Sequence, residues 1–185
     1  MHFEQNLIYH IYNQGNNKEP IFFQERNYLY FLRKMRKYLL PHVDFLCYCL
    51  MPNHFHFLVV VVNPSIQLKD NKTRRLNESI GLMLRSYTRA INRQEQRVGA
   101  LFRPRTKAKN GWIDEFITVG SKHEHLLFKP DNDYARTCFQ YIHNNPVEAG
   151  LVTKSEKWQY SSASDYAGLR NGTLCNQVLA KELLF

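Results

Sequence analysis

The sequence predicts an α+β protein with the ferredoxin-like order β-α-β-β-α-β, in which an antiparallel sheet carries helices on one side and a further helix follows. Segments with helical spacing and β-prone segments follow one another in this order along the chain. The chain has 185 residues, of which 44% are hydrophobic, and this is enough for one domain with a substantial core. We therefore expect a single domain over residues 1–185, with its core at about 3–150 and a C-terminal extension over 151–185.

The first half of the chain supplies a strand, a helix and two further strands. Residues 3–12 predict a strand that is closed by Asn-Gln-Gly-Asn-Asn at 13–17, residue types that tolerate turn geometry. Residues 24–40 follow as a helix with apolar side chains at helical spacing. Residues 43–50 and 55–62 are strongly β-prone and are separated by Met-Pro-Asn-His, which predicts adjacent antiparallel strands.

The second half adds a helix, an extended segment and a last helix. Residues 76–93 have helical spacing, and the polar stretch 63–73 before them is expected to be a mobile loop. Residues 102–109 alternate with period two, and Pro104 restricts them to an edge strand or an extended arm. Residues 111–130 look irregular or mixed. A helix over 131–145 begins with acidic capping residues and is expected to end near Pro146.

The composition excludes several classes of protein. Charged residues make up 22% and aromatic residues 14%, as in ordinary globular proteins and unlike disordered or collagen-like chains. The apolar run 55–62 is far shorter than the ~20 residues of a membrane span, and the amino terminus lacks the pattern of a signal peptide. The four cysteines form no CxxC pair, so reduced core thiols are expected, with Cys47 and Cys49 on one face of a strand. A cytoplasmic protein is expected.

The charge distribution predicts a polyanionic partner. Lys and Arg number 25 against 16 Asp and Glu, which gives a net charge of +9 and a pI near 9.4. The stretch 69–109 holds twelve basic and three acidic residues, so it carries this whole charge. A solvated face is the plainer explanation, but two successive elements each place their bases on one side, which favours phosphate contacts. The candidate DNA-binding residues are Arg85, Arg89, Arg93, Arg103, Arg105, Lys107 and Lys109.

His54 and His56 open the second strand of the predicted hairpin. Alternation along a strand places both imidazoles on one face and Phe55 on the other, a geometry that suits two metal ligands on a rigid support. A partly buried histidine more often satisfies a local hydrogen bond, so the pair by itself is weak evidence. A second pair, His123 and His125, brackets a charged residue that would not anchor a core, and we interpret it as a surface pair.

Tyr141 and Asn145 lie four residues apart on the last predicted helix, and therefore on one of its faces. Asn144 is a rival for the same role. A phenol with a pKa of ~10 attacks a phosphodiester poorly unless a cation neutralises the phosphate. Two histidines and an amide oxygen could hold that cation. The alternative is that Tyr141 only packs in the core.

Several ordered motifs together resemble one known family. They are Met-Pro-Asn-His-Phe-His-Phe-Leu-Val at 51–59 and Tyr-Ile-His-Asn-Asn-Pro-Val-Glu-Ala-Gly-Leu-Val at 141–152, with shorter likenesses at 9–23, 99–103 and 158–162. The chain resembles the REP-associated tyrosine transposases, which belong to the HUH single-strand nucleases.

The resemblance implies a mechanism and a set of roles. His54 and His56 would be metal ligands, Asn145 would match the third ligand, and Tyr141 would attack single-stranded DNA at hairpin-forming repeats to leave a 5′-phosphotyrosine and a free 3′-hydroxyl. The implied cofactor is Mg²⁺ or Mn²⁺. The implied partner is hairpin-bearing single-stranded DNA, and the implied process is DNA transposition. The protein would associate with the nucleoid in the cytoplasm. A monomer is favoured over a homodimer.

Two other functions remain open at this point. A protein of the same fold could bind structured single-stranded nucleic acid without cleaving it. A metal-dependent phosphohydrolase could use activated water, with Tyr141 structural, and would then form no covalent intermediate with DNA.

Overall fold

The main sheet has four antiparallel strands in the order β2-β3-β1-β6. This computed structural model describes residues 2–110 and 133–185. The strands are β1 (Ile8–Gln14), β2 (Val43–Met51), β3 (His54–Val61) and β6 (Lys107–Asn110). Because β3 lies between β1 and β2, the first β-α-β unit is split, as the ferredoxin-like prediction requires. The predicted α+β class is confirmed.

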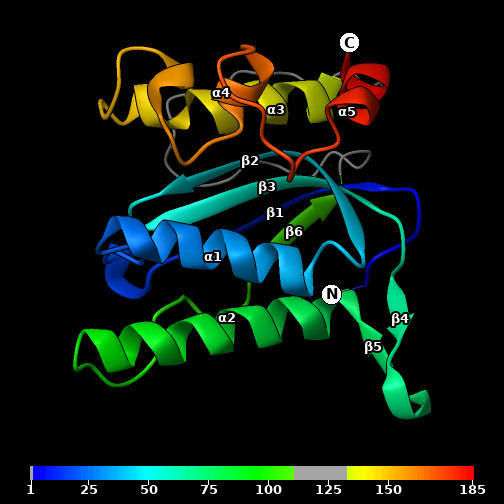
Figure 1. The fold of residues 1–185 in the computed structure, drawn as a ribbon, viewed down its shortest axis with the longest axis vertical. Coiled ribbons are helices and arrows are strands. Elements are labelled where there is room, and N and C mark those ends of the chain that lie inside the picture. The colour runs from blue at the N-terminus through cyan, green and yellow to red at the C-terminus, as the bar shows by residue number, and fades with distance from the viewer. Residues whose placement is uncertain (1, 111–132) are drawn as a thin grey trace.

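Helices cover both faces of this sheet (Figure 1). Helices α1 (Glu25–Tyr38) and α2 (Leu76–Gln94) lie on one face, as expected. The opposite face is covered by α3 (Asp133–Glu148), the added helix, together with the short helices α4 (Ala163–Tyr166) and α5 (Gln177–Leu184). Three 3-10 turns complete the described elements, at Asn16–Lys18, Lys69–Asn71 and Ser155–Lys157.

Strand alternation divides the buried side chains into two cores. On β3, Phe55 and Phe57 point into the core under α1 and α2, where Phe31 is fully buried. Leu58 belongs to the core under α3. The cysteines Cys47 and Cys49 are free thiols in this second core, as the sequence predicts.

The C-terminal extension crosses the outer edge of β2. The amide of Leu50 donates to the carbonyl of Tyr160 at 2.9 Å, and the indole of Trp158 donates to the carbonyl of Leu50 at 3.0 Å. The ring of Tyr160 stacks on Tyr28 of α1 with centroids 3.7 Å apart. Further along, the amide of Asn176 donates to the carbonyl of Phe45. The extension therefore continues the hydrogen bonding of the sheet and reaches both cores.

Two expectations about the elements are wrong. The first strand begins at Ile8 rather than residue 3, and Asn6 before it has a φ of 63°. The expected loop at 63–73 is largely a two-stranded ribbon, β4 (Ser65–Gln67) and β5 (Thr73–Arg75). The sequence did not predict these two strands because neither has a buried residue, so their side chains are mostly polar and show no apolar alternation.

The last helix ends near Pro146, as expected, although Pro146 is not its last residue. Pro146 lies inside α3, where its missing N–H removes one helical hydrogen bond. The helix stops two residues past Pro146, because Gly150 adopts a φ of 68° and the amide of Leu151 donates to the carbonyl of Pro146. The predicted irregular segment 111–130, the His123 and His125 pair, and the expected helix start at 131 lie outside the described residues.

In the two described ranges, no helix is both long enough and apolar enough to cross a membrane.

Candidate active site

Strand β3 and helix α3 bring four of the predicted site residues together. His54 and His56 project from the face of β3 that α3 covers, and α3 carries Tyr141 and Asn145 onto them. The Nε2 atom of His54 lies 3.1 Å from Oδ1 of Asn145. The ring of Tyr141 stands edge-on to that of His56, with centroids 5.5 Å apart and planes at 83°. All four residues belong to the same chain.

The structure separates the two candidate asparagines. Asn145 is 7% exposed and contacts His54, whereas Asn144 is exposed to solvent. One residue along a helix turns the side chain by about 100°, so only one of two neighbours can face the sheet. Tyr141 and Asn145, one helical turn apart, both face it.

The contacts of His54 leave two acceptors facing each other. Its Nδ1 lies 2.6 Å from Oδ1 of Asn53, and its Nε2 faces Oδ1 of Asn145. Amide oxygens only accept, and a neutral imidazole carries one N–H, so only one of these contacts is a hydrogen bond. With the proton at the shorter contact, the lone pairs of His54 Nε2 and Asn145 Oδ1 converge. A cation between them would satisfy both.

Two further residues of the site come from β1, and the sequence prediction missed them. His10 and Tyr12 share the sheet face of His56, since Tyr12 is the direct partner of His56 in the pairing of β1 with β3. His10 Nε2 lies 2.9 Å from His56 Nδ1, and the ring of Tyr12 lies 5.7 Å from that of His56. The available signal was polar alternation at 10, 12 and 14 within an otherwise apolar strand.

Burial sets the protonation of the cluster. It lowers the pKa of His54 and, more strongly, of His56, whose pKa the neighbouring His10 and His54 lower further. Burial, helped by the positive charge of Lys109, lowers the pKa of His10 to about 3. Near neutral pH these imidazoles are therefore uncharged and can offer lone pairs.

Tyr141 is a protonated phenol at neutral pH. Burial raises its pKa above the ordinary value, although a hydrogen bond with Asn145 acts in the opposite direction. The phenol therefore needs help from its surroundings to act as a nucleophile.

The donor set fits a divalent cation in an incomplete site. In the described part of the chain, no three His, Cys, Asp or Glu side chains gather to hold a metal. The two imidazoles and the amide oxygen of Asn145 supply three neutral donors. Such a set leaves coordination positions and positive charge for an anionic ligand such as phosphate.

The predicted basic residues lie at three places in the fold. Four of them line a groove of about 590 Å³ between α2 and residues 100–106, namely Arg85, Arg89, Arg103 and Arg105. Arg93 lines a second groove, between α1 and α2. Lys107 and Lys109 are the direct β6 partners of Tyr12 and His10 on β1, so they share the sheet face of the histidines.

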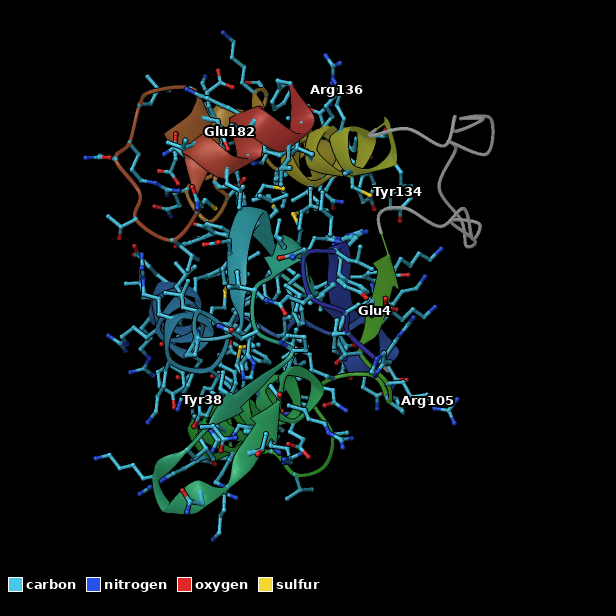
Figure 2. All side chains as sticks on the ribbon, turned by 90° about the vertical axis from the view of Figure 1, so that its right-hand side faces the viewer. Glu4, Tyr38, Arg105, Tyr134, Arg136 and Glu182 are labelled. Atoms are coloured by element: carbon cyan, nitrogen blue, oxygen red, sulfur yellow. The ribbon has the colours of Figure 1, made fainter. Side chains whose placement is uncertain are left out.

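The expected alternation over 102–109 is wrong in its first half. Phe102 forms a single bridge with Gly15, and Arg105 then adopts a φ of 63°, which interrupts the extended chain. Regular pairing resumes only at Lys107. Arg105 consequently projects outward from the body beside the lower end of β6 (Figure 2).

Comparison with known proteins supports the fold assignment. No family model matches the chain, and no curated protein matches it in sequence. A solved structure of a REP-associated tyrosine transposase bound to a REP hairpin is similar, with a TM-score of 0.58 and 15% identity. The match covers 92% of this chain and 85% of that chain. The resemblance carried by the sequence motifs is thus confirmed at the level of the fold: over nearly its whole length, the chain folds like that transposase.

Proposed function

We propose that the protein is a metal-dependent tyrosine nuclease and strand transferase that acts on single-stranded DNA at hairpin-forming repeats. The observation that carries the proposal is the convergence of Tyr141, His54, His56 and Asn145 at one place in the fold. The similar solved protein, a transposase bound to a hairpin, supports the same reading of the substrate. DNA transposition is the process we propose for it.

His54, His56 and Asn145 would hold Mg²⁺ or Mn²⁺. When bound, the cation would neutralise the scissile phosphate and polarise its phosphorus–oxygen bonds. The three protein donors are neutral, so the phosphate itself would supply the balancing negative charge. Substrate and cation would therefore bind more tightly together than separately.

Tyr141 would perform the attack. Its phenolic oxygen would form a bond to phosphorus while the bond from phosphorus to the 3′-oxygen breaks. The phenolic proton would leave to solvent, and the departing 3′-oxygen would take up a proton to become a free hydroxyl. The phosphate would stay attached to the 5′-oxygen of the downstream strand and would be joined to Tyr141. Attack by a DNA 3′-hydroxyl on this linkage would reverse the bond changes and join strands without ATP.

The arginine groove would hold DNA outside the reaction centre. The segment that carries Arg103 is attached to the end of β1, since the amide of Arg103 donates to the carbonyl of Gln14 at 2.9 Å. Gln14 is itself the direct β-sheet partner of His54. The groove therefore begins at the end of the sheet where His54 lies, and phosphates of a bound strand could reach both.

A covalent-adduct assay tests the proposal. Labelled single-stranded hairpin oligonucleotides are incubated with the protein and Mn²⁺ or Mg²⁺, and the products are separated on a denaturing protein gel. We expect a labelled protein band that EDTA prevents and that Tyr141→Phe abolishes while DNA binding is kept. Tyr12 also contacts His56, so peptide mapping of the adduct should identify Tyr141 and not Tyr12.

The other outcomes select between the alternatives. Cleavage that survives Tyr141→Phe without any labelled band would indicate water attack by a phosphohydrolase. Binding of a panel of hairpins with neither cleavage nor an adduct would indicate a binding protein of the same fold.

A further inference from the structure

We propose that His10 is a positioning residue that accepts the Nδ1–H of His56 and so leaves Nε2 as the free nitrogen of His56. The inference rests on the proposed function, because it gives His56 the lone pair that a metal ligand needs. His10 lies outside the motif at 51–59, 46 residues away from His56 in the chain.

The contact between the two imidazoles is short and shielded from water. His10 Nε2 and His56 Nδ1 are 2.9 Å apart, and the ring planes differ by 28°. Each of the two residues is 6% exposed. A hydrogen bond in such surroundings has no competing water, so the proton in it fixes which nitrogen of each ring is bare.

Proton accounting then determines the rest of the chain of contacts. The 2.9 Å contact holds one proton. If it is on His56, then His56 Nε2 is bare and His10 Nε2 is the acceptor, so the proton of His10 sits on Nδ1. That nitrogen lies 3.8 Å from Sγ of Cys138 on α3, a weak acceptor within reach of the N–H. With this arrangement of protons, His56 donates to His10 and His10 donates to Cys138, so every ring N–H in this series of contacts has an acceptor.

The opposite polarity would disable the ligand. If His10 Nε2–H donated to His56 Nδ1, the only proton of a neutral His56 would sit on Nε2 and point at the position of the cation. A protonated nitrogen cannot ligate a metal. Histidine ligands in metal sites commonly donate their second ring N–H to a fixed acceptor, which selects the tautomer. His10 is the acceptor that this fold supplies.

A packing role alone does not account for a histidine at position 10. Its neighbours in β1 on the other face, Tyr9 and Ile11, are apolar core residues, and leucine would fill similar space on this face beside Leu58 and Cys138. A buried imidazole costs free energy unless both nitrogens find partners. Both of its nitrogens do, and one of those partners is a candidate ligand.

Two substitutions separate positioning from packing. His10→Gln keeps an acceptor oxygen near the place of Nε2, whereas His10→Leu keeps the bulk and removes the acceptor. Long-range proton–nitrogen NMR of the metal-free proteins reports the tautomer of His56, and titration with Mn²⁺ alone reports affinity. Circular dichroism checks that each variant is folded.

We expect His56 of the wild-type protein to be the Nδ1–H tautomer. His10→Leu should reduce that tautomer and weaken Mn²⁺ binding by about 10- to 100-fold, while His10→Gln should restore both most of the way. An Nε2–H tautomer in the wild-type protein, or equal Mn²⁺ affinity in His10→Leu, would overturn the inference. If His10→Leu does not fold, the wild-type tautomer and the His10→Gln titration still decide it.

Failure of the proposed function looks different. A wild-type protein that binds no Mn²⁺ but has His56 as the Nδ1–H tautomer would refute the proposed metal site while supporting the role of His10 in fixing the tautomer.

Discussion

The side chain of Asn145 meets that of His54 with 3.1 Å between Oδ1 and Nε2, although the two residues are 91 positions apart in the chain. This contact joins the helix that carries Tyr141 to the strand that carries both histidines. One copy of the chain therefore contains all four residues of the cluster, and a monomer with its site in cis remains our prediction.

The two neighbouring asparagines provide a matched test of the metal site. Asn145→Ala removes the amide oxygen that faces His54, and we expect Mn²⁺ affinity to fall at least about tenfold, with loss of metal-dependent cleavage. Asn144→Ala, which changes an exposed side chain on the same helix, should leave both unchanged. Isothermal titration with Mn²⁺ measures the effect. Equal losses in the two variants would argue against Asn145 as a ligand.

The arginine groove predicts a change in the salt dependence of DNA binding. Replacing Arg85, Arg103 and Arg105 together by Gln should weaken binding and lower the slope of log affinity against log salt by about 2, since each lost phosphate contact removes about 0.7. Fluorescence anisotropy over a range of NaCl concentrations measures it.

A control for the loss of positive charge lies elsewhere on the surface. Lys154→Gln with Lys157→Gln removes two exposed bases from the C-terminal extension, and the slope should not change. If the triple variant has the same salt slope as the wild type, the groove does not contact DNA phosphates.

Stability should fall in mild acid because buried histidines resist protonation. Burial lowers the pKa of His143 to about 4, against ~6.5 in an unfolded chain. Between these two pH values only the unfolded state takes up the proton, so the free energy of unfolding falls as the pH drops from 6.5 toward 4. At about 1.4 kcal/mol per pKa unit, His143 contributes up to about 3 kcal/mol of this loss.

Urea denaturation at pH 7.5 and pH 5 measures that loss. His143 Nε2 lies 2.8 Å from Oγ of Ser162, and His143→Gln can keep a hydrogen bond there while removing the titration. The pH dependence of this variant should be shallower than that of the wild type. A variant with the same slope would mean that other groups cause the acid instability.

Two glycine substitutions should have opposite effects on stability. A Cβ at Gly15 would collide with the backbone carbonyl of Glu19, so we expect Gly15→Ala to cost about 1–3 kcal/mol. Gly81 lies inside α2, where a Cβ would meet only the flexible end of Arg85. There Gly81→Ala should stabilise the fold by about 0.5–1 kcal/mol. Thermal or urea denaturation compares them.

Gly15→Ala should also affect the candidate site. The amide of Gly15 donates to the carbonyl of Asn53 at 2.8 Å, and Asn53 holds His54 through its own side chain. We therefore expect weaker Mn²⁺ binding in Gly15→Ala but not in Gly81→Ala. A normal Mn²⁺ affinity in a folded Gly15→Ala protein would show that the turn does not support the site.

Local patterns predicted the strongly buried elements. Helix α2 buries one apolar face, which shows as helical spacing, whereas β2 and β3 are buried on both faces and show as nearly continuous β-prone runs. The His54 and His56 pair was placed on one sheet face by the alternation of side chains along a strand. Tyr141 and Asn145 followed from helical spacing.

Other features depend on contacts between distant segments, which local patterns do not encode. His10 is a site residue only because β3 pairs with β1, and the choice of Asn145 over Asn144 depends on how α3 lies on the sheet. The positive φ of Arg105 interrupts the expected alternation, and no glycine or asparagine at that position indicated it in the sequence. Pro146 located the end of α3 only to within two residues, because the helix tolerates one missing hydrogen bond.

The crossing of β2 by the C-terminal extension bears on how the protein could be shortened. Two pieces of the extension, around Ser161 and Cys175, form bridges to Cys49 and Phe45 on the outer side of β2. Without them, a nine-residue strand of mostly apolar side chains would present unpaired amides and carbonyls to other molecules. We therefore expect a chain cut after Gly150 to self-associate edge to edge rather than to yield a smaller folded monomer.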